Sequence, residues 1–341
     1  MKRHTVTFTA PYAVEVRDEA LPVPAPHQLL VAAQVSAISP GTEMLVYRGQ
    51  MPPDLPLDAT ISALDGAFAY PLTYGYAVVG RVLACGTAVS PSWQDRLVFA
   101  FQPHASHFLA APDELLPVPE GLDAETAVLL PNMETAVSFL MDSQPLIGEQ
   151  VAVFGQGIVG LLTAALLAQL PLARLVTADR HPLRRDWSTR LGAHASLDPA
   201  APTAVADLLT ELQQDRPYAG ADLTFELSGH PAALDQAIAV TGYNGRVLIG
   251  SWYGTKPVNL NLGGRFHRSH MQLISSQVSH LAPRWHGRWT SARRLGVAWA
   301  QLARCQPARL ITHRFPLAQA AAAYRLIDKQ PEQAIQVLLT Y

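Results

Sequence analysis

Short apolar stretches with few polar positions dominate the first third of the chain. Residues 5–8, 29–35, 77–83 and 96–100 are rich in β-branched side chains, and Pro, Gly, Asp and Ser separate them. Short runs of this kind, bounded by turn residues, indicate strands, and the first run also alternates polar and apolar residues. The pattern therefore predicts a partly closed β-barrel over this part of the chain.

Strands and helices alternate from about residue 126 onward. The expected strands are 151–154, 175–178, 223–227 and 246–250, and the expected helices are 158–170, 183–191 and 231–240. A strand followed repeatedly by a helix is typical of a parallel sheet with helices on both faces. This part of the chain is predicted to be a doubly wound α/β domain, and the residues after about 281 mix helix and strand again.

Composition narrows the classes of partner. The 341 residues suit two domains, and the net charge of −2 gives no electrostatic reason to bind nucleic acid or an anionic membrane. No run of 18 apolar residues occurs, and the N-terminus enters a strand-like pattern instead of a signal peptide, so we expect a cytoplasmic protein. The two cysteines, Cys85 and Cys305, are too few for a four-cysteine structural zinc site.

A glycine-rich motif, Gly155-Gln156-Gly157-Ile158-Val159-Gly160, follows the expected strand 151–154 and opens an apolar helix. The first glycine allows a tight turn, the second lets a pyrophosphate approach the backbone, and the third lets the helix pack on the strand. The N–H groups at the start of the helix attract phosphate. We therefore expect the whole motif to bind a dinucleotide.

The strand ends around this motif supply further cofactor candidates. Asp179 closes the next strand, where it would accept hydrogen bonds from the ribose hydroxyls and so favour NAD over NADP. Arg180 beside it could instead hold a 2′-phosphate, which leaves NADP open. A doubly wound sheet binds its ligand at the carboxyl ends of its strands. Four more residues at such ends are expected to contact the cofactor: Ser228, Gly250, Ser251 and Trp252.

The succession of barrel, doubly wound domain and returning tail resembles the medium-chain dehydrogenase/reductase superfamily. Its landmarks here are Ser39-Pro40-Gly41-Thr42-Glu43, Gly75-Tyr76-Ala77 and residues 245–250. More narrowly, the first two segments resemble bacteriochlorophyllide dehydrogenase-like proteins, which oxidise a hydroxyethyl side chain of a tetrapyrrole. The resemblance implies a GroES-like β-barrel catalytic domain over 1–125 and 281–341 and a Rossmann domain over 126–280. It also implies a nicotinamide cofactor, a small-molecule substrate and a homodimer.

The chain departs from zinc-dependent members of the superfamily at each ligand position. Those members carry Cys just before Gly-Thr-Glu or Gly-Thr-Asp, where this chain has Ser39-Pro40. They carry Gly-His-Glu where it has Gly75-Tyr76-Ala77, and their third ligand falls at Pro131-Asn132. A catalytic zinc needs three protein ligands, and none of these side chains is a good one. We therefore expect a site that works without zinc.

A metal-free site must hold the developing oxyanion with hydrogen-bond donors. Ser39, Tyr76 and Asn132 stand at the vacated positions and can all donate. Thr42 matches the hydroxyl residue that relays a proton from the substrate oxygen in the superfamily, so Thr42 and Tyr76 are the first candidates for contact with that oxygen. To act as a base, Tyr76 would need a pKa below its usual value of about 10.

Three titratable residues are further candidates. His104 could transfer a proton or orient the substrate. Glu134 could be a general base or an anchor for the ribose and nicotinamide, and Glu43 could orient its catalytic neighbours. A purely structural role is open for each of the three.

The leading hypothesis is a zinc-independent, NAD(P)-dependent oxidoreductase that moves a hydride between nicotinamide and a secondary alcohol or ketone. A quinone- or enoyl-type double-bond reductase is the alternative among enzymes, because such members of the superfamily also lack zinc. The relay hydroxyl of Thr42 favours the alcohol reaction. A dinucleotide-binding redox sensor or structural protein without turnover is the alternative of another class.

Overall fold

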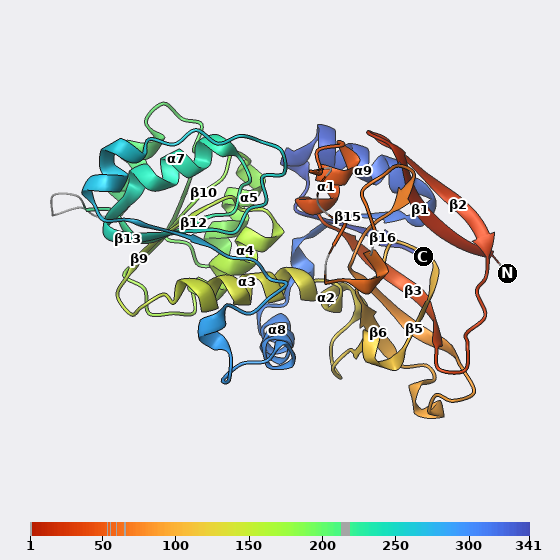
Figure 1. Ribbon diagram of the computed structural model, residues 1–341. Coiled ribbons are helices and arrows are strands. Elements are labelled where there is room, and N and C mark those ends of the chain that lie inside the picture. Colours follow the sequence, from red (N-terminus) through yellow and green to blue (C-terminus); the bar gives the residue numbers. More distant parts are fainter. Residues whose placement is uncertain (1, 53, 55, 59, 65, 213–218) are drawn as a thin grey trace. The chain divides into compact units, whose positions relative to one another are not determined.

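The computed structural model describes residues 2–52, 54, 56–58, 60–64, 66–212 and 219–341 (Figure 1). Its contacts divide the chain into two compact units. Unit 1 comprises Met1–Pro131 and Trp299–Tyr341, and unit 2 comprises Asn132–Ala298. Each unit has its own hydrophobic clusters, and each is described by itself below.

Unit 1 is the predicted β-barrel. Its seven-stranded sheet runs β15-β16-β3-β5-β6-β8, with β7 paired to β3, and a three-stranded sheet runs β2-β1-β4. The bounds of these strands are β1 Lys2–Ala10, β2 Ala13–Ala20, β3 Leu29–Ile38, β4 Leu72–Thr73, β5 Val78–Cys85, β6 Leu97–Ala100, β7 His107–Ala110, β8 Leu115–Pro117, β15 Ile311–Pro316 and β16 Gln336–Thr340.

The tail of the chain completes this barrel. Strand β16 pairs antiparallel with the central strand β3, so the last residues of the sequence lie beside residues 35–38. Every second residue of β3 from Leu29 to Ala33 enters one buried cluster, as side chains on one face of a strand do. Helices α1 (Thr42–Tyr47) and α9 (Ala320–Lys329) share a second cluster with β1 and β4.

Unit 2 is the predicted doubly wound domain. Its six strands are all parallel, in the order β11-β10-β9-β12-β13-β14. The strands are β9 Gln150–Phe154, β10 Arg174–Ala178, β11 Ala195–Leu197, β12 Ala221–Glu226, β13 Thr241–Ile249 and β14 Gln272–Ser275. Both faces of β9 are buried, because Val151 and Val153 belong to one hydrophobic cluster and Ala152 and Phe154 belong to another.

The helices of the described residues follow the expected alternation, with shifted ends. They are α2 Ala124–Ala127, α3 Leu130–Ser143, α4 Ile158–Leu167, α5 Pro182–Arg190, α6 Ala204–Glu211, α7 Pro231–Val240 and α8 Ser291–Cys305. The expected helix 158–170 ends at Leu167, because the next residues turn before Pro171. In the part of the chain that the structure covers, no helix combines the length and apolar character needed to cross a membrane.

Candidate active site

The glycine motif forms the turn between β9 and α4. Gly155 has φ +89°, and a Cβ there would lie 2.5 Å from the backbone nitrogen of Ser228. A Cβ on Gly160 would lie 1.9 Å from the carbonyl oxygen of Gly155. Both positions are therefore restricted to glycine, as the tight turn and the close packing of helix on strand require.

Gly157 has a different environment, and it is the one that suits a ligand. It is the N-cap of α4, no side chain caps the helix there, and a Cβ would meet nothing within 4 Å. Ile158 and Val159 form the first turn, whose backbone N–H groups have no partner inside the helix. An open backbone at a helix N-terminus is the cradle that a pyrophosphate needs, so these residues fit a dinucleotide.

Asp179 lies just past β10 and is 6% exposed. One carboxylate oxygen accepts from the backbone N–H of Gln156 at 2.7 Å, and the other from that of His181 at 2.9 Å. The carboxylate thus holds the glycine turn, and each of its oxygens keeps a lone pair for a ribose hydroxyl. The Arg180 side chain is exposed, whereas the Arg185 guanidinium donates to the carbonyls of residues 179 and 180.

The ends of β12 and β13 meet in a hydrogen-bonded group. Buried Glu226 accepts from the backbone N–H and the hydroxyl of Ser228, and also from the Tyr253 hydroxyl. The Ser251 hydroxyl accepts from the backbone N–H of Gly229 at 2.8 Å. These contacts fix the segment against which Gly155 packs, so Ser228 and Ser251 support the turn.

Two other predicted cofactor residues differ in environment. A Cβ on Gly250 would lie 2.3 Å from Cζ of Phe139, so this glycine is needed for packing on α3. Trp252 is 41% exposed, and its large apolar surface is open to a partner or ligand. Neither position shows a contact that defines a nicotinamide site.

In unit 1 the predicted hydroxyl residues come together. The Tyr76 hydroxyl donates to Oγ of Ser39 at 2.6 Å, and Thr42 lies within hydrogen-bonding reach of the same Tyr76 oxygen. All three side chains are partly exposed. Burial raises the pKa of Tyr76 to about 12, and its hydrogen bonds with Ser39 and Thr42 offset part of the rise. The structure therefore makes Tyr76 a hydrogen-bond donor and not a base near neutral pH.

His104 and Glu43 form a wholly buried pair beneath these hydroxyls. Both are 0% exposed, and Nε2 of His104 lies 2.9 Å from Oε2 of Glu43. The same carboxylate accepts from the backbone N–H of Ser39 at 2.8 Å and from the Tyr324 hydroxyl. The other ring nitrogen of His104 lies 2.7 Å from Oγ of Ser36. Neither side chain is exposed and both are paired with other protein groups, so they are placed to hold their neighbours, and the roles expected of His104 and Glu43 in the reaction stay predictions.

Tyr324 and Ser36 were not apparent as site residues in the sequence. Tyr324 lies on α9, more than 280 residues after Glu43, and it stacks on Tyr47 and contacts Phe8 edge-on. Ser36 also bonds the hydroxyl of Tyr341 at 2.8 Å. No motif spacing links these positions to the predicted site residues.

Glu134 and Asn132 lie on α3 in unit 2. Arg294 on α8 donates to Glu134 from Nε at 3.1 Å and from Nη2 at 2.7 Å, and Nη2 also donates to the Val278 carbonyl at 2.7 Å. Both partners of this ion pair are less than one-tenth exposed. Burial raises the pKa of Glu134, and Arg294 offsets part of the rise. The expected roles of Glu134 as base or ribose anchor are therefore replaced by a structural ion pair, and Asn132 is 9% exposed in the first turn of α3.

The zinc positions of the superfamily do not fit a zinc ion in this chain. Pro40 and Ala77 carry no ligand atom, and the Ser39 and Tyr76 hydroxyls bond each other. Within the described ranges, no three His, Cys, Asp or Glu side chains gather so that they could hold a metal ion. Hydroxyl side chains thus occupy two of the positions at which the resemblance to the superfamily places zinc ligands.

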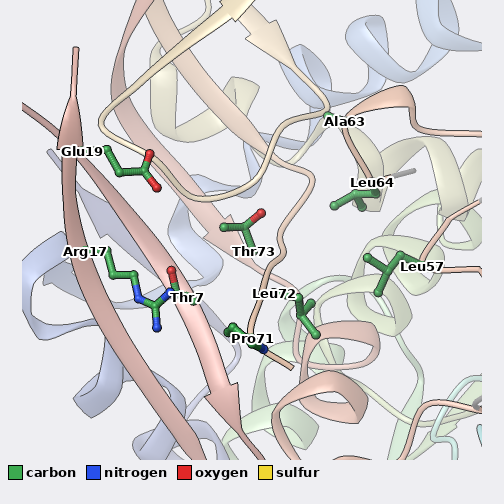
Figure 2. Close-up of a pocket in the computed structure, with 9 residues that line it drawn as sticks. All are labelled: Thr7, Arg17, Glu19, Leu57, Ala63, Leu64, Pro71, Leu72 and Thr73. Atoms are coloured by element: carbon green, nitrogen blue, oxygen red, sulfur yellow. The ribbon is translucent and has the colours of Figure 1, made fainter. Parts of the chain in front are cut away.

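Unit 1 also has a cavity of about 370 Å³ beside the three-stranded sheet (Figure 2). Its polar wall holds Thr7, Arg17, Glu19 and Thr73, and its apolar wall holds Leu57, Ala63, Leu64, Pro71 and Leu72. Arg17 pairs with Glu15 and Glu19 pairs with Arg3, so both charges of the polar wall are compensated. None of the hydroxyl residues described above lines this cavity.

Comparison with known proteins agrees with this architecture. The sequence family described as zinc-binding dehydrogenase matches residues 159–290, which excludes the positions of Ser39, Thr42 and Tyr76. D-guloside 3-dehydrogenase of Escherichia coli K12 is 24% identical over 96% of both chains. An Escherichia coli CFT073 alcohol dehydrogenase complexed with NADH has a TM-score of 0.79 at 17% identity, with 100% of this chain and 99% of that chain covered.

A Sinorhizobium meliloti 1021 protein described as a putative zinc-binding dehydrogenase bound to NADP has a TM-score of 0.77 at 19% identity, with both chains fully covered. Such likenesses establish the fold, a GroES-like barrel with a Rossmann domain. The glycine turn, the family match over residues 159–290 and the sequence relatives make the chain similar to alcohol-dehydrogenase-like oxidoreductases of the medium-chain dehydrogenase/reductase superfamily.

Proposed function

We propose that this protein is an NAD-dependent oxidoreductase that interconverts a secondary alcohol and a ketone without zinc. One observation carries the proposal: the hydroxyls of Ser39, Thr42 and Tyr76, three half-buried residues, gather at the positions where zinc-dependent members of the superfamily hold their metal. A set of hydroxyl donors can stabilise an alkoxide or a polarised carbonyl in place of a Lewis acid.

The protonation state of Tyr76 defines its part in the reaction. With a pKa of about 12 its hydroxyl stays protonated at working pH, so it would turn its one proton from Oγ of Ser39 to the substrate oxygen. The proton of the alcohol would pass to the Thr42 hydroxyl and from there to solvent. A nicotinamide held at the glycine turn would supply or accept the hydride at the carbon that bears this oxygen.

The cofactor preference follows from Asp179. A 2′-phosphate beside this buried carboxylate would meet like charge and would displace hydrogen bonds that hold the glycine turn. We therefore propose NAD as the preferred cofactor. The likeness to D-guloside 3-dehydrogenase supports a secondary alcohol on a sugar-like molecule, and the resemblance to bacteriochlorophyllide dehydrogenase-like proteins supports a hydroxyethyl side chain.

The test combines metal analysis with turnover. The protein is purified from zinc-supplemented cells, its metal content is measured, and NAD⁺ or NADP⁺ reduction is followed with glycosides, polyols and a hydroxyethyl tetrapyrrole. We expect less than stoichiometric metal and turnover that survives a chelator. Tyr76→Phe and Thr42→Ala should each lower kcat by about 10² or more.

The matched control is Tyr243→Phe, since Tyr243 is 60% exposed in unit 2. It should leave kcat unchanged. A stoichiometric, chelator-sensitive metal, or full turnover in both the Tyr76 and Thr42 variants, would refute the proposed site.

A further inference from the structure

We infer that His104 is the positioning residue of this site, because its one side chain holds both of the segments that carry the hydroxyl donors. The inference rests on the proposed function, since it concerns how the Tyr76 hydroxyl is kept 2.6 Å from Oγ of Ser39. A bound metal would tie its ligand segments together directly. A site built from hydroxyls needs another cross-link between these segments, and the buried imidazole is placed to be that link.

The first segment is held through Glu43. The imidazole Nε2 lies 2.9 Å from Oε2 of Glu43, and Oε1 of the same carboxylate accepts from the backbone N–H of Ser39 at 2.8 Å. The Glu43 carboxylate therefore links the imidazole, on one of its oxygens, to the Ser39 backbone, on the other.

The second segment is held by direct contact. The backbone N–H of His104 donates to the carbonyl of Tyr74 at 3.3 Å. Gly75 follows with φ +116°, and a Cβ on it would lie 2.6 Å from Cδ2 of the imidazole. The backbone thus passes flat against the ring before it reaches Tyr76. Removal of the ring would leave space into which this segment could move.

The ring itself has no freedom to move. It is 0% exposed, its Nδ1 lies 2.7 Å from Oγ of Ser36, and the Ser36 hydroxyl also bonds the Tyr341 hydroxyl. The Tyr324 hydroxyl donates to Oε2 of Glu43, the same oxygen that His104 contacts. Every ring nitrogen and both carboxylate oxygens have partners, so the group is rigid and its burial is compensated.

The test compares His104→Phe, which keeps a ring but loses both hydrogen bonds, with His104→Gln, which keeps a donor toward Glu43. We expect His104→Phe to lower kcat by about 10²-fold while its affinity for NADH changes by less than about two-fold. We expect the kcat of His104→Gln to be about tenfold higher than that of His104→Phe. His107→Gln is the matched control, because His107 contacts Ser106 and does not contact Glu43.

Two readouts separate positioning from general damage. In the Tyr76→Phe background, adding His104→Phe should lower kcat by less than about three-fold further, since the two changes remove the same interaction. Hydrogen–deuterium exchange of the peptide 36–43 should accelerate in His104→Phe and stay unchanged in His107→Gln, without any substrate present.

If His104→Phe does not fold, Gly75→Ala tests the same contact from the other side and should lower kcat while NADH still binds. Independent, multiplicative losses in the double variant, or unchanged exchange at residues 36–43, would overturn the inference. An unchanged rate in Tyr76→Phe itself would instead refute the proposed function, so the two failures are distinguishable.

Discussion

Replacement of Arg294 by Met should destabilise unit 2 strongly, because it leaves the Glu134 carboxylate buried without its partner. The side chains of Arg294 and Glu134 are 4% and 9% exposed, and three hydrogen bonds of the guanidinium would be lost. Removal of one partner of a buried ion pair costs about 3–5 kcal/mol. For a domain of this size that cost lowers the transition temperature by roughly 6–20 °C.

The pH dependence gives a sharper form of the same prediction. Burial already raises the pKa of Glu134, and loss of Arg294 removes the opposing effect, so the folded-state pKa should rise further. Below the unfolded-state pKa of about 4.3 the carboxyl carries a proton in both states, and the cost is absent. As pH rises toward the folded-state value the unfolded chain releases its proton first, so the variant loses stability over that window.

Thermal and urea unfolding at pH 5 and pH 8 measure this effect, with Trp fluorescence as the probe because Trp285 and Trp289 lie near Arg294 in the chain. Arg294→Met should be destabilised more at pH 8 than at pH 5. The double variant Arg294→Met/Glu134→Leu should recover most of the loss, because no charge then remains buried. An equal loss at both pH values, or no recovery in the double variant, would show that Glu134 is not the cause.

Three further predictions concern the cofactor and the hydroxyls. Gly155→Ala should weaken NADH binding by about 10- to 100-fold in a fluorescence titration. The new Cβ would strain the turn, because Gly155 has φ +89° and the backbone nitrogen of Ser228 lies close to it. An unchanged affinity for NADH would contradict the assignment of this turn to the cofactor. Asp179→Asn should lower the preference for NAD⁺ over NADP⁺ in kcat/KM by at least about tenfold, since the like charge is gone; an unaltered ratio would place the discrimination elsewhere. The pH profile of kcat should show no loss from Tyr76 ionisation between pH 7 and 10, because its pKa is raised to about 12; an alkaline limb near pH 9 that Tyr76→Phe abolishes would disprove this.

The fold was predictable because each unit repeats one simple pattern. Runs rich in β-branched residues, such as 29–35, became barrel strands, and the apolar run 151–154 became a strand buried on both faces. Short elements without a clear pattern, such as β14, did not stand out, because its two end residues are exposed and its two middle residues are only half-buried. Helices α2 and α3 follow each other closely, separated at residues 128–129.

The site was predictable only where residue type and motif coincided. Ser39, Thr42 and Tyr76 were found because they occupy known ligand positions, and the structure brings their hydroxyls together. Partners that join distant parts of the chain gave no such signal. Arg294 lies 160 residues after Glu134, and only the packing of α8 on α3 makes the two a pair.

The burial of the titratable residues bears on the chemistry expected of them. His, Glu and Tyr in one sequence suggest acid–base catalysis, yet His104, Glu43 and Tyr324 are all 0% exposed and bond only one another and their neighbours. A polar group removed from water is tolerated only when its hydrogen bonds are made inside the protein, and a network that makes them all is rigid. Rigidity is what a set of hydroxyl donors lacks without a metal, because each hydroxyl can rotate and each loop can shift. The residues that sequence reasoning offers as catalysts therefore divide by burial: Ser39, Thr42 and Tyr76 are half-buried, whereas the His104 imidazole and the Glu43 carboxylate are fully buried and placed to hold them.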